Sequence, residues 1–194
     1  MKRAKLLFVL GAFSTVFASG MPALAATCRD VNFPDSLTAG EANLVLNGLG
    51  LRKATFLGVK VYVAGLYLPQ KANDTGQILG VDRPWRLVLH FVRDVEGDDI
   101  REAFSEGFDK STDGKAEPLR PRIEALNALV PDLKVGDRLV FTHNAGQGIA
   151  VEFNDAPKGA VDGADLAAAM LGIWLGSEPP NDDLKTGLLG GKCE

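Results

Sequence analysis

The sequence predicts an α+β fold in which an antiparallel β-sheet carries helices on one face. Three observations support this prediction. Residues 43–54, 58–68 and 85–95 have the composition and alternation of β-strands. Apolar residues then recur at helical spacing over residues 97–108 and 119–130. A hairpin and two further helical segments follow, so strands and helices are segregated along the chain instead of alternating as in βαβ units.

The second and third of these strands are apolar on both faces. In residues 58–68, Val61 and Val63 lie on one face, whereas Tyr62 and Ala64 lie on the other. A strand that is apolar on both faces is covered on both faces. We therefore expect these strands at the centre of the sheet.

The first two helices have one buried face each. Residues 97–108 begin with paired aspartates, which the helix dipole favours, and Ile100, Phe104 and Phe108 share a face. Residues 119–130 have a proline near the start, where a helix tolerates it, and the same apolar spacing. Both helices are expected to pack on the sheet.

The rest of the chain predicts a hairpin and two helices. Residues 137–155 alternate on both sides of the turn sequence "NAGQ". Residues 163–176 are apolar nearly all round and predict a buried helix. Residues 179–191 begin with a double proline and end at glycines, with Asn181 or Asp182 as the N-cap.

The N-terminus has the three parts of a secretory signal. Lys2, Arg3 and Lys5 precede the apolar run "LLFVLGAFSTVFA", and Ala23 and Ala25 occupy the small-residue positions before a cleavage site. The alternative is an uncleaved membrane anchor, but the apolar run is short for a transmembrane helix. We expect a signal peptide over residues 1–25, a single domain over residues 26–194, and a periplasmic or secreted protein without membrane insertion.

The cysteines fit an exported protein. Cys28 and Cys193 are the only two, and an even number in an oxidising compartment predicts a disulfide. Two free thiols or an intermolecular bridge are the alternatives. No Cys-x-x-Cys sequence is present, which disfavours a redox role.

Charge and motifs exclude several classes of function. The net charge is −4, and no cluster of Lys and Arg is interleaved with aromatic residues, so nucleic acid and anionic membranes are poor partners. The two histidines are isolated on separate strands, and no metal-ligand constellation, phosphate-binding glycine loop or nucleophile elbow appears. We therefore predict no metal and no cofactor.

The stretch "GLGLRKA", residues 48–54, carries the functional signal. Gly48, Gly50 and Arg52 share one face of the predicted strand. Glycine in a strand often marks the close approach of a ligand or of another backbone. If that face is covered by helices, Arg52 needs an anion, which is either a protein carboxylate or a ligand carboxylate. Tyr62 on the next strand is a second donor for such a ligand.

The chain resembles the bacterial, exported branch of the chalcone isomerase-like family. The segments that carry the resemblance are "LNGLGLRKATFLGVKVYVAGLYLP", the helix after "RLVLHFVRDV", and the tail "AAAMLGIWLGSEPPNDDLKTGLLGG". The resemblance implies an open-faced β-sandwich, a large antiparallel sheet covered by a layer of helices, with a ligand cleft between the two. The family includes plant enzymes that cyclise chalcones and plant members that bind fatty acids without catalysis.

The family's catalytic residues carry over only in part. The arginine of its G-x-G-x-R sequence matches Arg52, and its threonine on the next strand falls on Tyr62. Its helix-borne tyrosine and asparagine fall on Ile100 and Gly107, and its late hydroxyl residue falls on Ile173. The resemblance therefore retains the cation and loses most of the donors that stabilise developing charge.

The fatty-acid-binding relatives match better, because they hold a carboxylate with an arginine and a tyrosine inside apolar walls. We expect a small apolar anionic ligand, fatty-acid-like or aromatic, in a non-catalytic site. One alternative is an intramolecular lyase, an isomerase of chalcone isomerase type that uses Arg52 and Tyr62. The other is an accessory protein without a ligand. The predicted ligand-binding residues are Arg52, Tyr62, Gly48, Gly50, Ile100, Phe104, Ile173 and Trp174.

Overall fold

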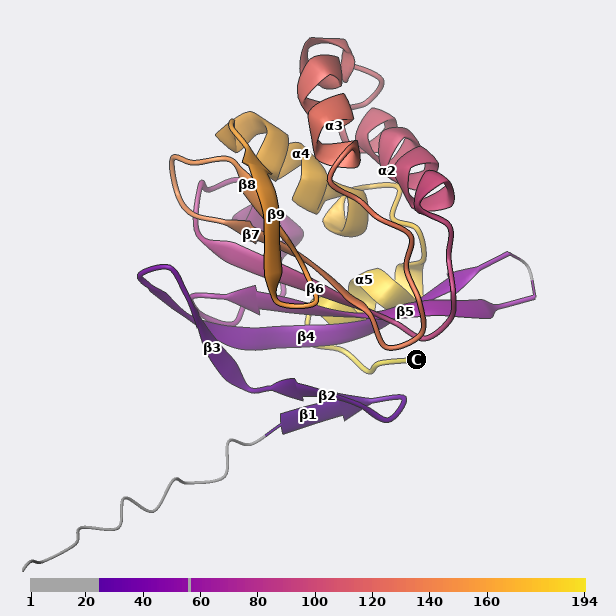
Figure 1. Ribbon diagram of the computed structural model, residues 1–194. Helices are drawn as coiled ribbons and strands as arrows, with labels where there is room; N and C mark the ends of the chain where they lie inside the picture. The colour runs from indigo at the N-terminus through magenta and orange to yellow at the C-terminus, as the bar shows by residue number, and fades with distance from the viewer. Residues whose placement is uncertain (1–24, 56) are drawn as a thin grey trace, which may run out of the picture.

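A large antiparallel sheet with helices on one face forms the body of the protein (Figure 1), as expected for an α+β fold. The computed structural model describes residues 25–55 and 57–194, so nearly all of the expected signal peptide lies outside the described residues. The sheet has seven strands in the order β3-β4-β5-β6-β7-β8-β9, and all neighbours are antiparallel. Its strands are β3 (Ser36–Ala39), β4 (Ala42–Ala54), β5 (Val59–Leu68), β6 (Trp85–Phe91), β7 (Arg138–His143), β8 (Ile149–Phe153) and β9 (Ala156–Val161).

The helices and a small second sheet complete the fold. Strands β1 (Ala25–Cys28) and β2 (Val31–Pro34) form a two-stranded sheet on their own. The helices are α1 (Thr75–Leu79), α2 (Gly97–Ser111), the 3-10 helix η1 (Glu117–Leu119), α3 (Arg120–Asn127), α4 (Ala164–Leu175) and α5 (Asp182–Leu188). In the described part of the chain, no helix has the length and apolar character needed to cross a membrane.

The sheet separates two apolar cores. Alternate residues of β5, such as Ala64 and Leu66, lie in the larger core under α2 and α4. Residues of the opposite parity, such as Val63 and Tyr67, lie in a smaller core that includes Phe33 of β2. The strand that the sequence predicted to be apolar on both faces is therefore covered on both faces.

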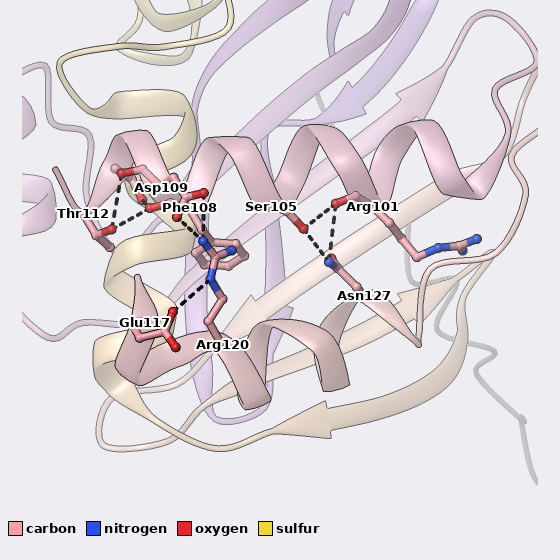
Figure 2. A network of polar contacts seen from close by, with 9 residues as sticks. Arg101, Ser105, Phe108, Asp109, Thr112, Glu117, Arg120 and Asn127 are labelled. Atoms are coloured by element: carbon pink, nitrogen blue, oxygen red, sulfur yellow. Dashed lines mark hydrogen bonds and ion pairs between the residues drawn. The ribbon is translucent and has the colours of Figure 1, made fainter. Parts of the chain in front are cut away.

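Helix α3 braces α2 through polar contacts (Figure 2). The Arg120 guanidinium donates to Asp109 of α2 over 2.7 Å, and Asn127 Nδ2 donates to Ser105 Oγ over 3.0 Å. These contacts join one end of α3 to the last turns of α2 and the other end to its middle. The buried face of α2 includes Phe104, whose ring packs against that of Phe141 of β7.

The glycine face of β4 packs directly on α5. A Cβ atom at Gly48 would lie 2.1 Å from Gly187 O, and one at Gly50 would lie 2.4 Å from Leu184 O. No side chain fits there, because the backbone of the helix occupies the space. The predicted contact of Gly48 and Gly50 with a ligand is therefore wrong: the close approach is that of another backbone.

A disulfide joins Cys28 of β1 to Cys193 after α5, with a Cα–Cα distance of 6.0 Å and a sequence separation of 165. The intrachain pairing predicted from the sequence is confirmed. The bond fixes the β1–β2 sheet and the tail that follows α5 to each other.

Candidate functional site

A cavity of about 630 Å³ lies beside the ends of β4 and β5. Its walls come from these strands, from α2 and the connection that precedes it, from the end of α4, and from the loop between α4 and α5. Six of the eight residues predicted from the sequence line it, and they are Arg52, Tyr62, Ile100, Phe104, Ile173 and Trp174. Gly48 and Gly50 do not line it.

The floor of the cavity is apolar and buried. Ile100 and Phe104 come from one face of α2, and Ile173 and Trp174 come from the facing side of α4. The rings of Phe104 and Trp174 pack edge to face with centroids 5.8 Å apart. Apolar walls with a few convergent polar groups are the general form of a small-ligand site.

Arg52 provides a cation without an internal carboxylate. It is half-buried, and no Asp or Glu of the described chain lies within ion-pair distance of it. Its Nη1 donates to three neutral oxygens, namely Lys53 O, Pro180 O at 3.3 Å and Asn181 Oδ1 at 3.1 Å. Nε and Nη2 have no partner among the described residues and are not buried, so this edge of the guanidinium is accessible.

Asn181 holds Arg52 in this orientation. It occupies the N-cap position of α5, as one of the two sequence alternatives had it, but its side chain makes no capping bond. Instead, its Oδ1 accepts from Lys53 N at 2.9 Å and its Nδ2 donates to Lys53 O at 3.0 Å. The segment that starts α5 is thereby fixed to β4 at the residue next to Arg52.

Tyr62 lies directly opposite Arg52 on the neighbouring strand, in the pair Arg52–Tyr62 of the sheet register. Its Oη accepts a hydrogen bond from Trp174 Nε1 at 3.0 Å. Burial raises the pKa of Tyr62, and the Trp174 hydrogen bond and the charge of Arg52 partly oppose that rise. Tyr62 is therefore a neutral phenol at physiological pH, with a hydroxyl hydrogen to donate.

The mouth of the cavity is charged, which the sequence interpretation missed. Its acidic residues are Asp94, Glu96, Asp99, Glu106 and Glu178, and its further basic residues are Arg93 and Lys110. Two of the acids are paired: Asp94 with Lys134 at 3.2 Å and Glu106 with Lys110 at 3.9 Å. Exposed charges on a helix surface are common, so the sequence gives no signal that these surround a cavity.

The positions to which the resemblance assigns the plant enzymes' catalytic donors hold apolar groups in this chain. Ile100 and Ile173 both line the cavity with hydrocarbon. At Gly107, a Cβ would lie 2.7 Å from Ile173 Cγ2, so the isoleucine fills the space that a side chain at residue 107 would need. Among the five positions matched to catalytic residues of the plant enzymes, only Arg52 and Tyr62 supply side-chain donors.

A solved structure shares this architecture. The crystal structure of a fatty-acid binding protein of Arabidopsis thaliana superposes with a TM-score of 0.69 and 16% sequence identity, covering 86% of this chain and 96% of that one. At this level of identity, the similarity concerns the fold. No curated protein sequence matches the chain.

The sequence itself matches a family model. The model is described as chalcone isomerase-like, and it matches residues 25–190, which include both sheets, all the described helices and every residue of the cavity. The chain therefore belongs to the chalcone isomerase-like family.

Proposed function

We propose that this protein binds a small apolar carboxylate, fatty-acid-like or aromatic, in the cavity between the sheet and α2 and α4, and that it does so without catalysis. Arg52 and Tyr62 bind the carboxylate. Ile100, Phe104 and Ile173 contact the apolar part of the ligand. The cavity volume of about 630 Å³ suits a ligand of drug-like size.

The observation that carries the proposal is the accessible edge of Arg52. A guanidinium with Nη1 engaged presents Nε–H and Nη2–H in parallel, which is the geometry that a carboxylate accepts in a bidentate contact. Neutral oxygens hold the group in place without neutralising it. The described residues therefore leave a positive charge beside an apolar floor, and a ligand carboxylate complements both.

The similar solved structure supports the ligand class, because it is that of a fatty-acid binding protein. The apolar residues at positions 100 and 173 support a binding site rather than an isomerase, since stabilisation of a developing charge needs donors already in place. Turnover of chalcones by the purified protein, abolished by Arg52→Ala, would contradict the non-catalytic part of the proposal.

We place the protein in the periplasm or outside the cell, as a member of a bacterial exported branch of the family. The expected signal peptide over residues 1–25 and the Cys28–Cys193 disulfide support this location, because disulfides persist in oxidising compartments. Recovery of the protein from an osmotic-shock or culture fraction, with Ala26 as its N-terminal residue, tests this part.

Native mass spectrometry of the protein purified from its natural source tests the ligand directly. We expect a bound mass that is released on denaturation and identified as a carboxylic acid. The Arg52→Gln variant should carry no bound acid. The Arg52→Lys variant should carry almost none, because an ammonium group cannot make the bidentate contact of a guanidinium. In titration calorimetry with decanoate, Arg52→Gln should weaken binding by at least about thirtyfold, the lower range for removing one partner of a buried charge pair.

Arg93→Gln is the matched control, because Arg93 also lines the cavity but is exposed at its mouth. It should retain the bound mass and change the affinity for decanoate little. A wild-type protein that carries no acid and binds none of a series of straight-chain and aromatic acids would contradict the proposal.

A further inference from the structure

We propose that Trp174 is a positioning residue that makes the site selective for an ionised carboxylate over neutral head groups of the same size. This inference rests on the proposed function and extends it to the chemical basis of selectivity. It starts from one buried hydrogen bond, that between Trp174 Nε1 and Tyr62 Oη at 3.0 Å.

The direction of this bond is fixed by chemistry. An indole N–H is only a donor, so the phenol oxygen of Tyr62 must accept. Both side chains are buried, with exposed fractions of 0% for Trp174 and 5% for Tyr62. The Tyr62 hydroxyl hydrogen therefore points away from Trp174, and Tyr62 Oη makes no other hydrogen bond within the described part of the chain.

The consequence is that the two residues proposed to bind the head group, Arg52 and Tyr62, offer it donors alone. The Tyr62 hydroxyl hydrogen and the free N–H groups of Arg52 come from directly opposite residues of β4 and β5. An ionised carboxylate offers only acceptors and satisfies all of them. An alcohol or a primary amide brings hydrogens for which neither Tyr62 nor Arg52 offers an acceptor, and a buried unpaired donor is unfavourable.

Without the Trp174 N–H, the phenol is free to reverse its role. Its hydroxyl can rotate, and its oxygen becomes an acceptor for a ligand hydrogen. Trp174→Phe should therefore weaken the binding of decanoate by roughly tenfold to a hundredfold, the range for a hydrogen bond to a charged group. The same change should leave the affinity for decan-1-ol or decanamide equal or higher.

Titration calorimetry with decanoate, decan-1-ol and decanamide tests this selectivity. A purely structural role for Trp174 predicts equal losses for all three ligands, and such equal losses, or none, would overturn the inference. In a Tyr62→Phe background, Trp174→Phe should have no further effect on the ratio of acid to alcohol affinity. An additional loss there would place the effect of Trp174 elsewhere.

Trp85→Phe is the matched control. Trp85 is also buried, at 3% exposure, and lies at the start of β6, but it does not line this cavity. Its removal should leave the selectivity unchanged. If wild-type protein binds no acid at all, the proposed function falls and this inference with it; if it binds acids through Arg52 and only the ratio fails to move, the inference alone falls.

A second measurement does not need the Trp174 variant to fold. The sequence has two tryptophans, so the spectrum of Trp85→Phe identifies the indole N–H resonance of Trp174. That hydrogen should exchange slowly with solvent and remain protected when decanoate is bound. Faster exchange in the bound state would mean that the ligand breaks the Trp174–Tyr62 bond, which overturns the inference.

Discussion

Ile173 of α4 occupies the space beside Gly107 of α2, where a Cβ atom would lie only 2.7 Å from the isoleucine Cγ2. At this contact, the large side chain of Ile173 lies against a residue of α2 that has no side chain. An isoleucine fits at residue 173 because residue 107 is a glycine. A polar side chain at residue 107 is compatible with this fold only if residue 173 becomes smaller.

We predict that Gly107→Asn destabilises the protein by about 1–3 kcal/mol, the usual effect of overpacking a buried contact. Adding Ile173→Thr should recover most of that loss, because the clash involves an isoleucine methyl group. Urea denaturation of the single and double variants measures both effects. Ala103→Asn, at an exposed position of the same helix, is the control and should change the free energy of unfolding little.

Asn181→Asp should weaken the binding of decanoate although Asn181 does not line the cavity. The new carboxylate would lie where Asn181 Oδ1 now accepts from Arg52 Nη1 at 3.1 Å, and it would neutralise the anchor. Titration calorimetry at two salt concentrations measures the loss. Ser177→Asp, in the same loop but exposed, adds the same charge without this contact and should have a much smaller effect.

Gly48→Ala should destabilise the protein by more than about 3 kcal/mol, beyond the usual range for an added methyl group. The reason is that the Cβ would meet the backbone oxygen of Gly187 at 2.1 Å, and a backbone cannot rotate away as a side chain can. Gly76→Ala in α1 is the control, because its Cβ would meet only a side-chain atom, Asp74 Oδ1 at 3.3 Å, and no backbone. A small effect of Gly48→Ala in thermal and urea unfolding would contradict the close contact between Gly48 and the α5 backbone.

Acid should weaken the contact between the β7–β8 turn and the loop before β6. Asp82 accepts from His143 Nε2 at 2.7 Å and from Gly146 N at 2.8 Å, and these bonds lower the pKa of Asp82 below its usual value. A carboxyl whose pKa is lowered by folding stabilises the protein above its unfolded pKa, near about 3.9, and that contribution is lost as the pH falls through the folded value.

Asp82→Asn should accordingly be less stable than wild type at neutral pH, and the difference should shrink as the pH falls below about 4. Urea denaturation between neutral pH and pH 3 measures it. Glu102→Gln, on the exposed side of α2, should follow the wild-type curve. A difference between Asp82→Asn and wild type that stays constant over this range would contradict the assignment.

The sequence predicts the central sheet and most of the cavity well, for a physical reason. Alternation fixes which face of a strand each residue occupies, so Arg52 and Tyr62 share a face as soon as their strands pair. Helical spacing does the same for Ile100 and Phe104. Residues whose placement follows from periodicity were therefore found.

Residues without a periodic signal were missed or misassigned. Strand β9 has the sequence "APKGAV", which contains a proline and is exposed over most of its length, and α1 has only five residues. The glycines at 48 and 50 mark close approach, but a glycine gives the same signal for a ligand as for a helix backbone. Only the packing of α5 decides between the two.

The direct backbone contact between α5 and β4 also makes the β4 wall of the cavity more rigid than the α2 wall. On the β4 side, main-chain atoms of helix and strand touch with no side chain between them, so neither element has room to shift without losing the contact. On the α2 side, the boundary consists of side chains whose torsions can adjust. Adaptation to acids of different width should therefore occur through the side chains of α2, while the Arg52 guanidinium keeps its place.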